Sequence, residues 1–391
     1  MIESTALATA EFRRDAESRM RSAFRAWGYR EIDAPVLMDY EVLRRAGSSA
    51  EDVAYKLVDE GGRIMVLRPD MTAPIAEMAS RNWSDVPRPL RVCYFSRLFR
   101  RNAGDREFFQ AGAELLGGGD VAADAEVIGL CCDLLDAAGV GRYQINLGDT
   151  GVLEEIATSL GFESTRRDSL RDSLARRDMV AVEALLEGLP PRDLARAETL
   201  LPYRGALQGQ DLGEMATAGV GDALLRRIED LMGWLRDIAP AGDIGFDPSL
   251  VRKLDYYTGP VFEVYCPQTG EMLGGGGRYD GLMGRFGMDE PATGFAVDLG
   301  SIESAAEMNG VYPDPGEMCL VIAGGDSPTH ALELARELRD AGKRVILERM
   351  PQGGEDALPG RARTVGARRI YLVREDIHEI PVSPGEGDDP R

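Results

Sequence analysis

Histidine is nearly absent from this chain, in which only His330 and His378 occur among 391 residues. Both lie near the C-terminal end. Their position excludes a Ser-His-Asp or Cys-His catalytic arrangement in the larger N-terminal part. It also disfavours a histidine-based metal site. We therefore expect no metal and no histidine-dependent catalytic residues in that part of the chain.

Cysteine is scarce as well, and long apolar runs are missing. The five cysteines form no Cys-x-x-Cys pair, which is typical of reduced, mostly buried thiols in a cytoplasm. No apolar run approaches the roughly 20 residues that cross a bilayer. The first residues show no basic stretch followed by an apolar one. These absences predict a cytoplasmic protein that is not associated with a membrane.

Positive charge is also in short supply, because 45 Lys and Arg face 66 Asp and Glu and the net charge is −21. A surface of this kind repels phosphate backbones unless a local basic patch intervenes. Neither a Walker-type phosphate loop nor a dinucleotide fingerprint is present. We therefore expect no cofactor. The length and the 44% hydrophobic content suit two or three folded domains.

Hydrophobic spacing predicts helices and short strands in the first part of the chain. Apolar side chains recur every three or four residues over 5–27, which indicates a helix that Gly28 would end. Asp120 is placed to cap a helix of about 18 residues that ends near Gly139. Strands are expected at 32–37, 64–67, 90–100, 108–116 and 143–147.

The second part of the chain changes character twice. Residues 151–236 have helical spacing interrupted at Pro190-Pro191, which indicates a helical insertion. Residues 244–266 and 271–300 return to strands and glycine-rich turns. Residues 313–316 are a candidate linker. After it, strands at 318–323, 344–347 and 370–373, a turn at 324–327 and a helix at 329–341 predict a small, partly parallel α/β unit.

Three segments outside the glycine-rich region carry polar side chains that could act together. They contain Asp70 and Thr72, then Arg100, Gln110 and Glu114, then Arg252, Tyr256, Tyr257 and Glu263. This set suits a zwitterionic amino acid. The carboxylates would hold an ammonium group, the arginines would hold a carboxylate, and an outer polar group would read the side chain.

Each of these residues also has an ordinary structural explanation. Asp70 could simply cap a helix over 72–79. Arg100 could be a surface charge at a strand end. Tyr256 and Tyr257 would point to opposite faces of a strand, so that at least one belongs to the core. Glu114 is the hardest to explain in this way, because a carboxylate in an apolar run is buried and needs a partner.

The stretch from Gly274 to Ser301 is the most informative part of the sequence. Residues 274–277 are four consecutive glycines, which by themselves favour a sharp turn over a ligand-binding loop. Arg278-Tyr279-Asp280 follows.

In this order the segments resemble the catalytic core of histidyl-tRNA synthetase, a class II aminoacyl-tRNA synthetase. Residues 28–35 are similar to motif 1, residues from Leu98 onward to motif 2, and residues 294–301 to motif 3. Residues 252–263 and 274–280 are similar to the two histidine-specific signatures. The resemblance covers roughly residues 5–300. It implies an α+β fold, with an antiparallel sheet flanked by helices, a helical insertion and a small C-terminal α/β domain.

The resemblance also implies domain bounds and a site. The synthetase-like domain would span 1–312 with its insertion at about 151–236, and 317–391 would be a shortened anticodon-binding-like domain. A histidine pocket is implied, with Arg100 and Arg252 at positions that contact ATP and the carboxylate. Its other residues would be Asp70, Thr72, Gln110, Glu114, Tyr256 and Tyr257.

Three departures from the synthetase pattern concern the adenylating reaction. Ser301 stands where motif 3 would place an arginine against ATP. Arg101-Asn102 follows the motif 2 arginine where a glutamate is expected, in a shortened loop, and Lys253 replaces a glycine. Losing one preorganised cation costs about 3 kcal/mol or more in the transition state. The resemblance therefore implies a pocket without adenylate formation and without catalytic residues.

These departures are similar to those of the regulatory subunits of ATP phosphoribosyltransferase, paralogues of the synthetase. The resemblance implies a non-catalytic protein that assembles with a short-form catalytic subunit and supports its activity in histidine biosynthesis. Histidine would be its effector, and a homodimer would form through the motif 1 region within a hetero-oligomer. Residues 317–391 hold 11 Lys and Arg against 14 Asp and Glu, a net charge of −3. We therefore expect no tRNA partner.

Other functions remain open on the sequence. The chain could be an active histidyl-tRNA synthetase with unusual motifs, or another histidine-activating ligase that ignores tRNA. Both would exchange pyrophosphate into ATP in a histidine-dependent reaction. A plain histidine-binding module would neither do this nor activate a phosphoribosyltransferase.

Overall fold

The computed structural model describes residues 2–47, 50–101, 106–200, 212–238, 243–252, 256–310, 317–324 and 328–382. The chain divides into two compact units, Phe12–Val311 and Met1–Glu11 with Tyr312–Arg391. The linker expected at 313–316 lies outside the described residues, as does most of the turn expected at 324–327. No helix of the described part is both long enough and apolar enough to cross a membrane.

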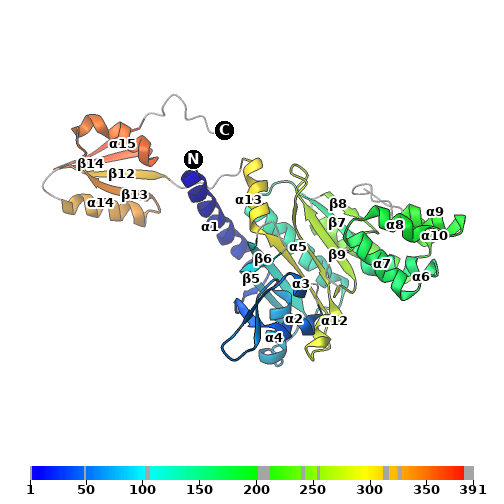
Figure 1. The fold of residues 1–391 in the computed structure, drawn as a ribbon. Helices are drawn as coiled ribbons and strands as arrows, with labels where there is room; N and C mark the ends of the chain where they lie inside the picture. Colours follow the sequence, from blue (N-terminus) through cyan, green and yellow to red (C-terminus); the bar gives the residue numbers. More distant parts are fainter. Residues whose placement is uncertain are drawn as a thin grey trace. The chain divides into compact units, whose positions relative to one another are not determined.

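A mostly antiparallel sheet forms the centre of the larger unit (Figure 1). Its strands, in spatial order, are β1 (Arg30–Glu31), β5 (Leu90–Phe99), β6 (Glu107–Leu116), β11 (Ala292–Asp298), β10 (Met272–Arg278), β9 (Pro260–Tyr265), β7 (Gln144–Asp149) and β8 (Asp243–Phe246). Only the β1–β5 and β7–β8 pairs at the two edges are parallel. This is the helix-flanked antiparallel sheet that the sequence predicted.

The two faces of this sheet pack against different helices because side chains alternate along each strand. On β5, Cys93 joins the core formed with α1 (Ile2–Ala26), α5 (Val121–Ala138) and α13 (Leu299–Met308). Val92 and Tyr94 point to the opposite face, towards α2 (Tyr40–Ala46), α4 (Thr72–Asn82) and α12 (Asp280–Arg285). Gln110 and Glu114 of β6 lie on this second face.

Local capping explains which sequence-based boundaries were right. The side chain of Asp120 accepts a hydrogen bond from the Ala123 N–H, and Gly139 ends α5 in the left-handed conformation, as predicted. The strand predicted at 32–37 is wrong. The chain forms β1 before this stretch and β2 (Leu37–Asp39) at its end. Pro35 lies between them and has no N–H to offer a strand ladder.

A small three-stranded sheet lies beside the second face. Its antiparallel order is β2, β4 (Ile64–Leu67) and β3 (Tyr55–Val58), and α3 (Ala50–Val53) precedes β3. Apolar side chains remain exposed on this sheet and at the position directly before β2. They are Val36, Leu37, Leu57, Val58 and Ile64.

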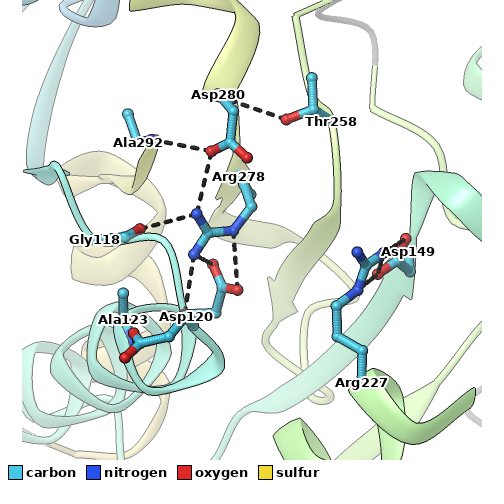
Figure 2. Close-up of polar contacts among 10 residues, drawn as sticks. Gly118, Asp120, Ala123, Asp149, Arg227, Thr258, Arg278, Asp280 and Ala292 are labelled. Carbon is cyan, nitrogen blue, oxygen red and sulfur yellow. Dashed lines mark hydrogen bonds and ion pairs between the residues drawn. The ribbon is translucent and has the colours of Figure 1, made fainter. Parts of the chain in front are cut away.

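Six helices follow β7, and the helical character expected for 151–236 is confirmed in the described residues. They are α6 (Thr150–Ser159), α7 (Ser164–Ala175), α8 (Met179–Leu186), α9 (Pro191–Leu200), α10 (Leu212–Ala218) and α11 (Asp222–Ile238). Pro191 opens α9, which explains the interruption seen in the sequence. Helix α11 packs on α5, and Arg227 pairs with the buried Asp149 at the end of β7 (Figure 2).

The smaller unit contains a four-stranded mixed sheet. Its order is β13 (Arg344–Arg349), β12 (Met318–Ala323), β14 (Arg369–Val373) and β15 (Ile377–Pro381), with only β15 antiparallel to its neighbour. Helix α14 (Pro328–Asp340) covers one face. Helix α15 (Leu358–Val365), which follows the short 3-10 helix Gly354–Ala357, covers the other. The predicted partly parallel α/β unit is confirmed, although β15 and α15 were not predicted.

Candidate functional site

A cavity of about 880 Å³ lies over the second face of the central sheet. Side chains from β6, β9 and β11 form much of its floor, and the segment before β9 and the start of α4 add further walls. All eight residues that the sequence singled out line this cavity, namely Asp70, Thr72, Arg100, Gln110, Glu114, Arg252, Tyr256 and Tyr257. Three segments far apart in the sequence therefore meet in one pocket.

Glu114 is the most enclosed acid of the cavity, with 2% of its surface exposed. It accepts hydrogen bonds from the Thr72 hydroxyl at 2.8 Å and from the Tyr279 hydroxyl. The partner that the sequence required for a buried carboxyl is therefore present. Burial raises the pKa of Glu114 to about 8, because removal from water penalises the charged form more than the two hydroxyls stabilise it. At neutral pH the carboxyl is mostly protonated.

Asp70 combines the two roles that its sequence context suggested. Its Oδ1 accepts a hydrogen bond from the Ala73 N–H at 3.0 Å and so caps the first turn of α4. Its Oδ2 is buried and has no hydrogen-bond partner among the described residues. Burial raises the pKa of this carboxyl, and the nearby Arg100 partly opposes that effect. One acceptor oxygen of Asp70 is thus left for a donor inside the cavity.

Three tyrosines form an aromatic wall next to these acids. The ring centroids of Tyr256 and Tyr257 are 5.1 Å apart, and those of Tyr256 and Tyr279 are 5.8 Å apart. Tyr256 and Tyr257 are in a turn and the loop after it, so the strand expected there is wrong. Both rings therefore line the same cavity instead of pointing to opposite faces of a sheet.

Arg252 supplies a cation at the wall next to β9. Its Nη1 donates to the Phe262 carbonyl at 3.0 Å and lies 3.9 Å from Glu263 Oε1. Its guanidinium also lies 5.8 Å from the centre of the Tyr257 ring. A guanidinium has five N–H groups, so Arg252 retains donors for a further acceptor.

Arg100 is a cavity residue and not merely a surface charge. Its Nε donates to the Pro69 carbonyl at 2.8 Å, and its guanidinium lies 4.8 Å from the centre of the Phe108 ring. Gln110 lines the cavity from the same strand as Glu114. Asn102 and Lys253 are two of the positions at which the sequence departs from the synthetase pattern. Both lie outside the described residues.

The four consecutive glycines belong to strand β10. The sharp turn that they favour by themselves does not form. They are needed because other groups approach the backbone closely. A Cβ on Gly275 would overlap Nη1 of Arg252 and the Phe262 carbonyl, and a Cβ on Gly276 would overlap the Gly294 carbonyl. Glycine therefore admits the Arg252 guanidinium to the cavity floor, a requirement that a local reading of the sequence does not reveal.

Arg278 and Asp280 hold this region together instead of lining the cavity (Figure 2). The Arg278 guanidinium is buried, pairs with Asp124 at 2.9 Å and donates to the Gly118 and Asp120 carbonyls. Asp280 accepts from Arg278 and from the Ala292 N–H. These contacts tie the end of β10 to the start of α5.

Ser301 belongs to the first turn of α13. Its backbone N–H donates to Asp298, the residue that caps this helix. Asp298 itself lines the cavity. The motif 3 region thus presents an acid to the cavity, and the position expected for an arginine carries a short neutral side chain.

Sequence reasoning missed several cavity residues. Tyr94, Tyr265, Tyr279 and Asp298 line it from strands or strand ends, and Arg176 and Arg177 line it from the insertion. The alternation along β5 and β6 could have placed Tyr94 on the face of Glu114. No local signal connects Arg177 with β9.

Fold and cavity together define a class II aminoacyl-tRNA synthetase-like core with a pocket rich in polar side chains. A family model described as histidyl-tRNA synthetase matches residues 2–302. The solved structure of a histidyl-tRNA synthetase from Nostoc shares this fold, with a TM-score of 0.77 at 20% identity over 94% of this chain and 92% of that one.

Closer relatives identify the branch of this class. The chain is 35% identical to an ATP phosphoribosyltransferase regulatory subunit from Symbiobacterium thermophilum over 91% of this chain and 92% of that one. It is 36% identical to the one from Geobacillus kaustophilus over 93% and 92% of the two chains. A solved structure from Bacillus halodurans, described as ATP phosphoribosyltransferase regulatory subunit/histidyl-tRNA synthetase, has a TM-score of 0.80 at 29% identity over 93% and 94%. The chain belongs to the family of ATP phosphoribosyltransferase regulatory subunits.

Proposed function

We propose that this protein lacks aminoacylation activity and activates a separate short-form ATP phosphoribosyltransferase catalytic subunit in the cytoplasm. The reaction is the first step of histidine biosynthesis, and histidine bound in the cavity is the feedback signal. The observation that carries the proposal is that all eight candidate residues line one cavity, while a neutral residue, Ser301, stands at the position of the ATP-binding arginine. The proposed partner follows from the names of the relatives, which are regulatory subunits of ATP phosphoribosyltransferase.

Histidine fits the chemistry of the cavity. The free oxygen of Asp70 and the enclosed carboxyl of Glu114 offer acceptors for its ammonium and ring N–H groups. Arg252 offers donors for its carboxylate. The proposed site also contains Thr72, Arg100, Gln110, Tyr256 and Tyr257. The bound amino acid can shift the catalytic partner only as far as its affinity differs between the two states of the complex.

Phosphoribosyl transfer by a short-form catalytic subunit, measured with and without this protein, tests the proposal. We expect the rate to rise when the protein is added and to fall again when histidine is added. An unchanged rate in both steps would leave the chain a plain histidine-binding module.

We further propose that residues 1–312 act as one synthetase-like domain with the insertion at about 151–236. Residues 317–391 then form a shortened anticodon-binding-like domain that binds no tRNA. The proposed homodimer uses the motif 1 region and the small sheet beside it. The apolar side chains exposed there include Val58, with 72% of its surface exposed. We propose that these exposed apolar side chains are covered by the second copy of the chain.

The dimer gives a direct prediction. Val58→Asp places a charge in an apolar interface and should convert the dimer to monomers at micromolar concentration, because a buried unpaired charge costs several kcal/mol. Val180→Asp is the matched control, since Val180 is 77% exposed on α8 in the insertion. Analytical ultracentrifugation measures both. A Val58→Asp protein that remains dimeric would place the interface elsewhere.

A further inference from the structure

Arg177 has the most unusual backbone conformation of the described residues. Its φ is +56°, and no other described residue except glycine has a positive φ. This left-handed region disfavours every residue with a Cβ. A residue kept there against its preference often serves a function that its surroundings enforce.

The conformation arises at the end of α7. The Arg177 N–H donates to the Leu174 carbonyl, and the Asp178 N–H donates to the Ser173 carbonyl, both at 2.9 Å. These two bonds form the helix-ending motif in which glycine is the usual residue. Helices α2, α5 and α15 follow this rule, with Gly47, Gly139 and Gly366 in the left-handed conformation. Helix α7 uses an arginine instead.

The side chain of Arg177 reaches from the insertion to the cavity wall. Its Nη2 donates to the Tyr265 hydroxyl at 2.5 Å and lies 3.6 Å from Glu263 Oε2. Tyr265 and Glu263 both belong to β9 and both line the cavity. The segment between α7 and α8 thereby contacts β9, the strand whose Phe262 carbonyl accepts the hydrogen bond from Arg252.

Glu263 lies between two cations. Its Oε2 accepts from the Tyr265 hydroxyl and faces Arg177, while its Oε1 is 3.9 Å from Arg252 Nη1. Only 13% of the Glu263 side chain is exposed, so this carboxylate needs a neutralising partner. Without Arg177, Arg252 would be the only cation paired with Glu263 in the part of the chain that the structure describes, and it would be less available to a ligand.

We propose that Arg177 is a positioning residue for the pocket. By pairing with Glu263 it leaves Arg252 free to bind the carboxylate of the amino acid, and it holds the insertion against the pocket wall. The inference rests on the proposed histidine site and adds a residue from the insertion to it. Arg177 acts through Glu263 and Arg252 and does not itself touch the ligand.

Arg177→Gly separates this role from a role in folding. Glycine suits the left-handed position, so we expect a melting temperature that is unchanged or about 1–3 °C higher. Histidine affinity, measured by calorimetry on the full-length protein, should nevertheless fall about three- to tenfold. Arg177→Lys keeps the charge and should recover part of that loss.

A double-mutant cycle with Glu263→Gln gives the decisive readout. In the Glu263→Gln background, Arg177→Gly should change histidine affinity less than twofold, because no carboxylate remains to compete for Arg252. An equal loss in both backgrounds would overturn the proposal, as would wild-type affinity in Arg177→Gly. If the wild-type protein itself binds no histidine, the proposed histidine site fails, and this outcome is distinct from a failure of Arg177 alone.

Discussion

Glu114→Gln is expected to weaken histidine binding about 100-fold, which corresponds to roughly 2–3 kcal/mol. The carboxyl is enclosed, and the hydroxyls of Thr72 and Tyr279 hold its two oxygens in place. Glutamine keeps the shape but turns an NH₂ group towards one of these hydroxyls, and it cannot become an anion beside a cationic ligand. Calorimetry with histidine measures the change.

The matched control is Glu290→Gln. Glu290 is partly buried, with 15% of its side chain exposed, and it pairs with Arg88 outside the cavity. Its replacement should leave histidine affinity unchanged. Equal affinity of the wild-type and Glu114→Gln proteins would reject Glu114 as a ligand residue.

The raised pKa of Glu114 gives the same variant a second signature. With a pKa of about 8, the carboxyl is mostly protonated at pH 7 in the free protein. A bound cation would lower this pKa, so the wild type should release nearly one proton when histidine binds. The Glu114→Gln protein should not release this proton. Calorimetry in buffers of different ionisation enthalpy measures this difference.

The sign for stability follows from the same shift. A carboxyl with a raised pKa contributes stability below its unfolded value of about 4.3 and loses that contribution as the pH rises through about 8. Between pH 5 and 8 the free wild-type protein should therefore lose more stability than Glu114→Gln. Parallel stability curves would contradict the raised pKa.

Gly275→Ala is expected to abolish histidine binding and to destabilise the larger unit by about 1–3 kcal/mol. The added methyl group would overlap Arg252 Nη1 and the Phe262 carbonyl. One of these groups is a proposed ligand contact, and the other belongs to the neighbouring strand. Relief of the overlap therefore moves either the guanidinium or the sheet.

Gly284→Ala provides the control for this substitution. Gly284 lies in α12 and does not have a positive φ. A Cβ added there would have no heavy atom within 4 Å. Alanine is favoured over glycine there by roughly 0.5–1 kcal/mol. Thermal unfolding and histidine calorimetry compare the two variants. Wild-type binding by Gly275→Ala would show that the close approach of Arg252 is not required.

Local signals in the sequence predicted the elements that they themselves determine. Asp120 and Gly139 define α5 because a cap and a left-handed glycine act within a few residues of the helix. The four glycines misled a local reading because the reason for them is non-local, since Arg252 and the flanking strands approach their backbone. The pairing of Arg177 with Glu263 was hidden for the same reason, because it joins the insertion to β9.

The candidate site was predictable to the extent that residue chemistry and the resemblance agreed. Glu114 could be singled out because a carboxyl inside an apolar strand needs partners, and Thr72 and Tyr279 are those partners. The arrangement of the aromatic wall could not be predicted, because the local pattern places Tyr256 and Tyr257 on a strand that does not form. Its geometry depends on the path of the chain before β9.

The most direct test of a regulatory rather than a synthetic role is the rate of phosphoribosyl transfer by a short-form catalytic subunit during a titration with histidine in the presence of this protein. We expect a rate that depends on this protein and falls as histidine is added, and a Glu114→Gln complex that resists histidine. A rate independent of this protein, together with histidine-dependent exchange of pyrophosphate into ATP by the chain alone, would contradict the regulatory role and identify a working ligase.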